Sequence, residues 1–139
     1  MQRKLKKLKE YLKKQKSVRL VYLFGSRATD KQSPLSDVDI AVYLDEKLNK
    51  KQRFRTQLKL IGDICSILKR NDVDVVVMND ASVFLNFEII KHNKVLVNKD
   101  NEERVDREVK SMKYYLDRKA HLESLDIPFD NRDVWTYKN

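Results

Sequence analysis

Apolar positions in the first third of the chain change period from helical to alternating. Leucines and a tyrosine recur every three to four residues within 3–16, which predicts an amphipathic helix. Residues 18–24 are β-branched and aromatic and stop at Gly25, as expected of a short strand. From Asp37 to Val42 apolar and other positions alternate, which predicts a second strand with one apolar face.

The second half of the chain continues this alternation of helices and strands. A three-to-four period over 47–69 predicts the longest helix, with Asn71 as its stop. A β-branched run at 72–78 predicts a third strand, and a short strand follows at 95–97. Between them we expect a helix over 81–92, for which the cap candidates are Asn79 and Asp80. A last amphipathic helix is predicted over 101–123, with apolar positions at Val105, Val109, Met112 and Leu116.

This order of elements predicts an α/β (α+β) fold, with a small mixed β-sheet and helices packed mainly on one face. The loop between the first two strands is too short for an ordinary crossover helix. A short helical turn from Ser26, or antiparallel or mixed pairing, therefore fits better than a doubly wound parallel sheet. The length suits a single domain, 1–139, with a basic amphipathic helix at 1–17 and an irregular tail at 124–139.

The positive charge of the chain is concentrated at its start. The net charge is +9, and the first 19 residues hold nine basic side chains against the single acidic Glu10. A solvated helix face is the favoured interpretation, and contact with RNA or with an acidic surface of a partner is the alternative. The aromatic residues of the tail fit a docking arm for a partner protein or a segment folded back on the domain; they are Phe129, Trp135 and Tyr137.

Targeting and redox signals are weak in this sequence. No apolar stretch follows the basic start, and no run approaches the 18 apolar residues of a membrane span. The lone Cys65 has no disulfide partner within the chain. We therefore expect a soluble cytoplasmic protein without membrane contact.

Two aspartates in the second predicted strand are the first candidates for chemistry. Asp37 and Asp39 are two residues apart, so in a strand they point to the same side, roughly 6.6 to 6.8 Å apart. Carboxylates held side by side repel, and Mg²⁺ between them offsets the repulsion. The third predicted strand offers a further carboxylate from Asp74 or from its rival Asp72. Asp74 is favoured because apolar residues flank it on both sides.

The turn after the first predicted strand is the second candidate site. Gly25 removes a side chain, so backbone N–H groups can approach an anion, and Ser26 adds a hydroxyl donor at a predicted helix start. A phosphate-binding turn beside a cation site provides the groups that in-line attack on a nucleotide phosphorus requires.

These residues resemble the signature of the polymerase-β-type nucleotidyltransferase superfamily. Its pattern is Gly-Ser, about ten residues, Asp-x-Asp, and a third acidic residue on a later strand; Gly25, Ser26, Asp37, Asp39 and Asp74 match it in order. The resemblance covers about residues 18–98 and implies a polymerase-β-like nucleotidyltransferase fold. The short chain is similar to the minimal nucleotidyltransferase (MNT) branch, commonly the antitoxins of HEPN/MNT toxin–antitoxin pairs.

The resemblance also implies an activity and a partner. An MNT antitoxin transfers AMP from ATP to a tyrosine of its HEPN RNase toxin and thereby neutralises it. Asp37, Asp39 and Asp74 would then serve two Mg²⁺ ions and the acceptor hydroxyl, while Gly25, Ser26 and Arg27 would bind the ATP phosphates. The alternatives are an antitoxin that acts only by stoichiometric binding, or a nucleotidyltransferase whose acceptor is a small molecule or RNA.

Overall fold

A four-stranded mixed sheet forms the centre of the protein. The computed structural model describes residues 2–24, 38–91 and 94–127. Strands β1 (Val18–Phe24), β2 (Val38–Leu44), β3 (Val73–Val77) and β4 (Lys94–Asn98) lie in the order β3-β2-β1-β4. β1 pairs antiparallel with both β2 and β4, whereas β2 and β3 are parallel. The predicted mixed sheet is therefore confirmed, and β1 has the predicted bounds.

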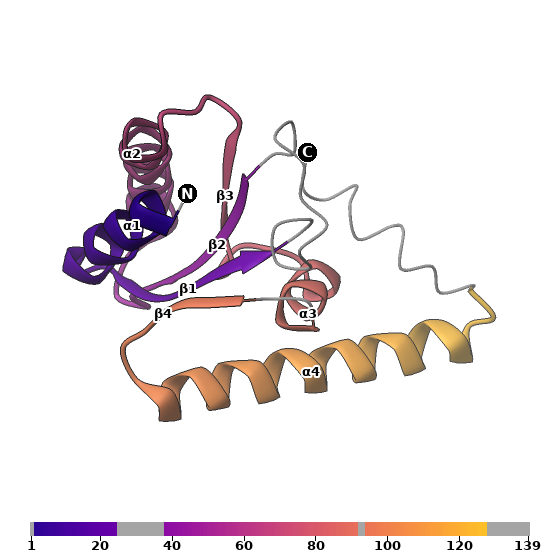
Figure 1. Ribbon diagram of the computed structural model, residues 1–139. Coiled ribbons are helices and arrows are strands. Elements are labelled where there is room, and N and C mark those ends of the chain that lie inside the picture. Colours follow the sequence, from indigo (N-terminus) through magenta and orange to yellow (C-terminus); the bar gives the residue numbers. More distant parts are fainter. Residues whose placement is uncertain (1, 25–37, 92–93, 128–139) are drawn as a thin grey trace.

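Helices cover both faces of this sheet, which corrects the expectation that they pack mainly on one (Figure 1). α1 (Gln2–Lys14) and α2 (Lys50–Leu68) lie on one side, and α3 (Val83–Lys91) and α4 (Asn101–Ser124) on the other. The reason is that the two central strands are mostly apolar on both faces, and every residue of β2 is buried. A sheet of this kind needs a covering layer on each side.

The first core lies between the sheet, α1 and α2. Leu8 and Leu12 of α1, one turn apart, are at most 1% exposed, and α2 adds Leu60, Ile64 and Leu68. The apolar positions of α2 only partly coincide with this face, because Phe54 and Leu58 remain more than half exposed. Helical spacing thus located α2 correctly but did not identify its buried side. The prediction that α2 is the longest helix is wrong, because α2 has 19 residues and α4 has 24.

Local capping sets the ends of α2. Asn49 and Gln52 form a reciprocal capping box at its start, where each side chain accepts from the other residue's backbone N–H at 2.8 Å. The helix ends at Leu68, and its C-cap Lys69 adopts the left-handed conformation (φ 54°) and donates its N–H to the Cys65 carbonyl. The helix predicted over 47–69 therefore ends one residue early, and its C-cap is Lys69 and not the predicted stop Asn71.

The start of α3 differs from the predicted caps. Ser82 accepts from the Leu85 N–H at 3.1 Å, as an N-cap does. Asn79 instead bonds both backbone groups of Leu44, at 2.9 and 3.0 Å, and so joins the β3–α3 turn to the end of β2. Asp80 forms a two-bond ion pair with Arg53 of α2, at 2.7 and 2.9 Å.

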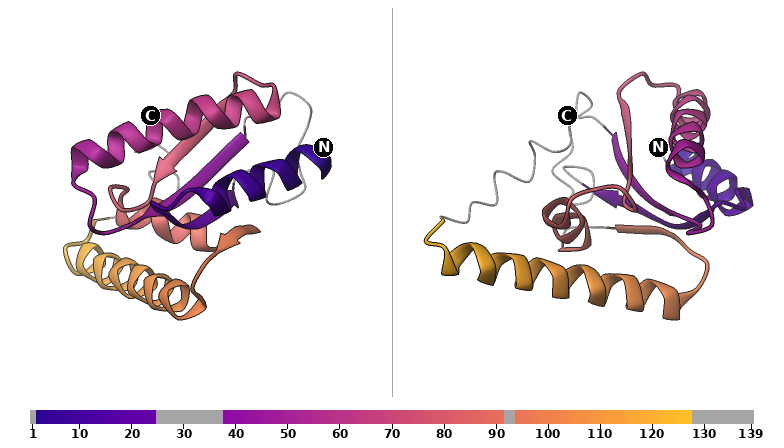
Figure 2. Two further views of the ribbon diagram at one scale, coloured as in Figure 1. Left: turned by 90° about the vertical axis from the view of Figure 1, so that its left-hand side faces the viewer. Right: turned by 180° about the vertical axis from the view of Figure 1, so that it is seen from behind.

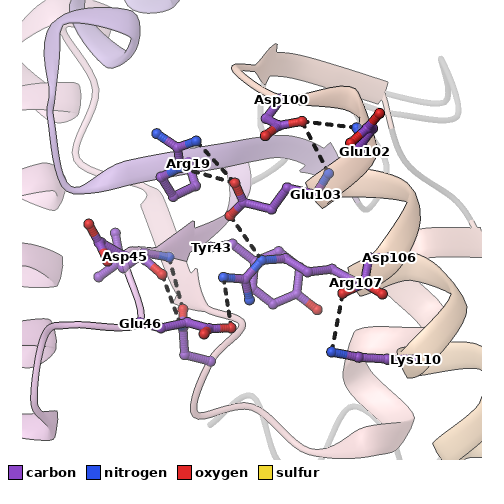
Figure 3. Close-up of polar contacts among 12 residues, drawn as sticks. Arg19, Tyr43, Asp45, Glu46, Asp100, Glu102, Glu103, Asp106, Arg107 and Lys110 are labelled. Carbon is purple, nitrogen blue, oxygen red and sulfur yellow. Dashed lines mark hydrogen bonds and ion pairs between the residues drawn. The ribbon is translucent and has the colours of Figure 1, made fainter.

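Polar contacts hold α4 against the second face of the sheet (Figure 3). The Arg107 guanidinium lies 4.6 Å from the ring centroid of Tyr43 and forms ion pairs of 3.3 Å with Glu103 and Glu46. Glu103 also accepts from Arg19 of β1 at 3.0 Å. Arg107 therefore connects α4 to the sheet and to the turn that follows β2.

Aromatic rings join α4 to α3 further along the helix. The ring of Tyr115 stacks on Phe87 with centroids 3.7 Å apart, and it meets Phe84 edge-on at 6.3 Å. Such pairs add to the burial of their area. α3 and α4 thus form one layer on this face of the sheet.

Alkaline pH should destabilise the fold through its buried tyrosines. Burial, and next the neighbouring Glu108, raise the pKa of Tyr22 above its usual range. The unfolded phenol ionises near pH 10, so the contribution of Tyr22 to stability is complete below that pH and is lost as pH rises through the higher folded pKa, by up to about 1.4 kcal/mol per pH unit. Urea unfolding between pH 9 and 11 measures this slope.

Tyr22→Phe is the matched variant for this measurement, because it keeps the ring and removes the titrating hydroxyl. Its stability should fall less steeply above pH 10 than that of the unmodified protein. Equal slopes in the two proteins would contradict the assignment to Tyr22. Tyr43, whose pKa is also raised by burial, accounts for part of the slope that remains.

Candidate nucleotidyl-transfer site

The two described candidate aspartates lie side by side on neighbouring strands. In the parallel pairing of β2 and β3, Asp39 is the direct partner of Asp74, and paired strands lie roughly 4.8 Å apart. Val38, Ile40 and Val42 enter the core beneath α1 and α2, so Asp39 points to the opposite face, where α3 and α4 lie. Asp39 is 7% exposed, which makes it one of the few buried ionisable side chains among the described residues.

The remaining predicted site residues lie outside the described part of the chain. Gly25, Ser26, Arg27 and Asp37 fall within 25–37, so their placement stays a prediction. Their described neighbours are informative, however. Phe24, after which the Gly-Ser pair follows directly in sequence, is the antiparallel partner of Asp39.

Asp72, the rival of Asp74, has a different environment. Its carboxylate forms an ion pair with Arg70, whose Nε donates to Oδ1 at 2.6 Å, at the entrance to β3. Its backbone carbonyl accepts from the Val38 N–H at 3.0 Å. Asp72 therefore lies two residues before Asp74 and outside β3, and the geometry favours Asp74 as the third carboxylate.

Asp74 also borders a hollow of about 430 Å³ between α2, β3 and the start of α3. Its walls include Gln57, Val76, Asp80 and Leu85. Gln57 was missed by sequence analysis, since nothing distinguishes one glutamine on a lysine-rich helix; in the structure its Nε2 donates to the Val75 carbonyl at 2.7 Å. The hollow offers room for an acceptor group with a carboxylate on one side and apolar side chains on the other.

A larger hollow of about 510 Å³ lies at the opposite end of β2, against α4. It is bordered by Tyr43 and by the ion-paired residues of Figure 3, including Arg107 and Lys110. Neither Asp39 nor Asp74 borders it. Because most of the charged groups of the larger hollow are paired with one another, we place the candidate site at the smaller hollow beside Asp74.

The described residues supply only some of the side chains that a binding site for a divalent cation needs. No cluster of three or more acidic, histidine or cysteine side chains able to hold a metal occurs in 2–24, 38–91 and 94–127. Asp39 and Asp74 supply hard carboxylate oxygens of the kind Mg²⁺ prefers. Asp37 precedes β2 directly and would add a third carboxylate.

The described helices include none that is long and apolar enough to cross a lipid bilayer. This holds for α4 as well, the longest of them, because charged residues occur throughout its sequence.

Solved structures of toxin–antitoxin complexes are similar to this chain. A chain of a crystal structure described as a toxin–antitoxin with AMP-PNP is 27% identical, with a TM-score of 0.69, and the match covers 88% of this chain and 93% of that chain. A chain of the tri-AMPylated Shewanella oneidensis HEPN toxin in complex with MNT antitoxin is 25% identical, with a TM-score of 0.68 and coverages of 89% and 93%. A chain of an MntA–HepT toxin–antitoxin is 25% identical, with a TM-score of 0.68, and the match covers 90% of this chain and 95% of that chain.

The sequence also matches a protein-family model over more than half of the chain. No curated protein matches the chain. The model described as Polymerase beta, Nucleotidyltransferase matches residues 6–102. This range extends from α1 to the first residues of α4 and includes every strand of the sheet, the Gly-Ser pair and all candidate aspartates. The chain therefore belongs to the polymerase beta nucleotidyltransferase family.

Proposed function

We propose that this protein is an antitoxin that transfers AMP from ATP to a tyrosine of a HEPN RNase toxin and thereby neutralises it. The observation that carries the proposal is the pairing of Asp39 with Asp74 on a nucleotidyltransferase fold. The complexes with AMP-PNP and with a tri-AMPylated HEPN toxin support the donor, the transferred group and the partner. The reaction belongs in the cytoplasm, where ATP is available.

The nucleotide and metal would be held at the Asp39 end of the sheet. Asp37, Asp39 and Asp74 would hold two Mg²⁺ ions, which when bound offset the charge of the phosphates and of the leaving pyrophosphate. Gly25 and Ser26 would bind the β- and γ-phosphates through backbone N–H groups and a hydroxyl, and Arg27 would brace a phosphate. The site is therefore built where β1 ends beside β2.

Asp74 would act on the acceptor. A tyrosine hydroxyl has a pKa near 10, so at neutral pH it needs a base within hydrogen-bond reach to become nucleophilic. With the acceptor ring in the hollow beside β3, the Asp74 carboxylate would take the hydroxyl proton as the phenolic oxygen bonds to the α-phosphorus. The bond from that phosphorus to the bridging oxygen breaks, and pyrophosphate leaves.

The test is transfer of label from α-labelled ATP. We expect the purified protein to label a tyrosine of its cognate HEPN toxin and the labelled toxin to lose RNase activity. Inhibition without label would indicate an antitoxin that acts only by occupying the toxin. Label on RNA or on a small molecule, with an unlabelled toxin, would keep the transferase and replace the acceptor.

Asp74 on β3 and Asp72 just before β3 allow a matched comparison of roles. We expect Asp74→Asn to lower the rate of AMP transfer about 100-fold or more, because a positioned base typically contributes 10² to 10⁴. Asp72→Asn, two residues away and paired with Arg70, should retain most of the activity. Initial rates of toxin labelling at saturating ATP measure the activity of both variants. A larger loss of activity in Asp72→Asn than in Asp74→Asn would assign the third carboxylate to Asp72.

A further inference from the structure

The positive charge of the protein is concentrated on one face of the sheet. α1 holds seven basic side chains and one acidic, and α2 holds five and one, which gives this layer a net charge of +10. On the other face, α3 and α4 together hold seven basic and seven acidic side chains, so that layer is neutral. A solvated helix ordinarily carries both signs, as α4 does, whereas a layer of one sign attracts polyanions.

Six exposed basic side chains follow the outer sides of α1 and α2, and we call them the basic track. They are Arg3, Lys7, Lys14, Lys51, Arg55 and Lys59. On α1, the buried Leu8 and Leu12 face the core, and the basic residues of the track lie on the other side of the helix. The three residues of α2 are spaced by four and therefore lie in one row.

Two contacts make the track continuous from one helix to the other. Lys4 Nζ donates to the Leu68 carbonyl at 3.3 Å, and Lys59 Nζ donates to Gln15 Oε1 at 3.4 Å, so α1 and α2 lie side by side and antiparallel (Figure 2). The end of α1 is therefore beside Lys59, where the row on α2 begins. At 1.5 Å per residue, the two rows together are roughly 30 Å long, enough to meet several successive phosphates.

The charges of the track are left for a partner outside the described fold. Within 2–24, 38–91 and 94–127, none of the six side chains forms an ion pair with an acidic residue. The one acidic residue of α2, Asp63, accepts from the Tyr11 hydroxyl. No described helix or strand lies outside α1 and α2 (Figures 1 and 2).

We propose that the basic track binds the phosphate backbone of double-stranded RNA. Surfaces for single strands stack bases on aromatic rings, and the track offers none. The exposed ring of α2, Phe54, is nine residues from Asp63, which contacts α1; nine residues are two and a half turns, so Phe54 is on the side of α2 away from α1. The proposal goes beyond AMP transfer and does not depend on it.

The shape of the layer is the argument for RNA over DNA. Helices packed side by side have axes 8–10 Å apart and diameters of about 10 Å, so the α1–α2 layer is roughly 20 Å wide. The major groove of B-DNA, where proteins read DNA with a helix, is only about 12 Å wide. The wide, shallow minor groove of A-form RNA instead accepts a broad basic surface, which contacts phosphates and 2′-hydroxyl groups across it.

The test is the affinity of the full chain for a labelled RNA duplex of about 20 base pairs, long enough to cover the track. Fluorescence anisotropy measures this affinity over a range of salt concentrations. Because six phosphate contacts release counterions, the affinity should fall about 10³-fold between roughly 50 and 200 mM KCl. A DNA duplex of the same sequence should bind about tenfold more weakly or worse.

Paired substitutions locate the contacts. Lys7→Gln with Arg55→Gln removes one contact from each helix, so it should weaken binding about tenfold or more at low salt and lower the salt slope by about 2. Lys113→Gln with Arg118→Gln is the matched control, since it removes two exposed basic side chains from α4, and it should leave the slope unchanged. Both proteins should transfer AMP to the toxin at the unmodified rate.

A second pair on the same track, Lys14→Gln with Lys51→Gln, covers the case in which the first pair does not fold. It should lower the salt slope by the same amount, about 2, because each phosphate contact adds about 1.

Four results would overturn the proposal. One is the absence of RNA binding at about 50 mM KCl. Another is a DNA duplex that binds as tightly as RNA, which would assign the track to DNA. The third is an equal loss of slope in the α4 control, which would indicate overall charge and not the track. The fourth is a chain that does not bind RNA and whose affinity for the HEPN toxin falls in Lys7→Gln with Arg55→Gln, which would assign the track to an acidic surface of the toxin.

Discussion

Asp39→Asn should abolish AMP transfer while leaving the protein folded. The substitution keeps the size of the side chain and removes a charge beside Asp74, its partner across the β2–β3 pairing. A metal acting on developing phosphate charge contributes several kcal/mol, so the rate of toxin labelling should fall about 10³-fold or more. Because Asn matches Asp in size and its amide can still form hydrogen bonds, the thermal unfolding midpoint of the variant should stay close to that of the unmodified protein.

Activity and stability must be measured on the same samples for this variant. Retained labelling by Asp39→Asn would remove the metal assignment, whatever the role of Asp74. A lost activity together with a lower unfolding midpoint would show instead that Asp39 acts mainly in the fold. Mg²⁺ titration gives a further criterion, because a remaining activity of the variant should need more Mg²⁺ than that of the unmodified protein.

Leu60→Ala should cause a large loss of stability. Leu60 is 1% exposed and packs in the core between α1, α2 and the sheet. Truncating a buried leucine removes its transfer free energy and leaves a cavity, which together cost about 2 to 5 kcal/mol. Small domains unfold with only about 5 to 15 kcal/mol, so the loss is a substantial share of the total. Urea denaturation measures this loss of unfolding free energy, and an unchanged m-value shows that the variant still unfolds in the same way.

Leu58→Ala is the matched control, since it makes the same substitution two residues earlier on α2. Leu58 is 54% exposed, so the free energy of unfolding should change by less than about 0.5 kcal/mol. Equal losses at the two positions would mean that something covers the exposed face of α2 in solution.

Much of the fold could be predicted because the central strands are unusual in composition. Six of the seven residues of β1 are apolar or aromatic, the exception being Arg19, so both the strand and its bounds follow from the sequence. The side to which Asp39 points follows from alternation in β2. The pairing of Asp39 with Asp74 does not follow from the sequence, because the register of two strands depends on how two distant segments meet.

Other features could not be predicted because helical spacing does not say what a helix packs against. Val105 and Val109 have the same spacing as buried helix positions, yet they are exposed, while Ser111 and Tyr115 face the domain. The role of Asn79 was misassigned for a similar reason. An asparagine after a strand is a common cap, and only the nearby end of β2 gives it two backbone partners instead.

The bond from Gln57 to the Val75 carbonyl has a consequence for solubility. β3 is an outer strand, and outer strands invite other chains to extend the sheet, which is a route to aggregation. With its amide on the free side of β3, Gln57 occupies a backbone group that an incoming strand would need. One backbone carbonyl next to Asp74 is therefore already occupied, which makes this edge of the sheet less able to recruit strands from misfolded neighbours.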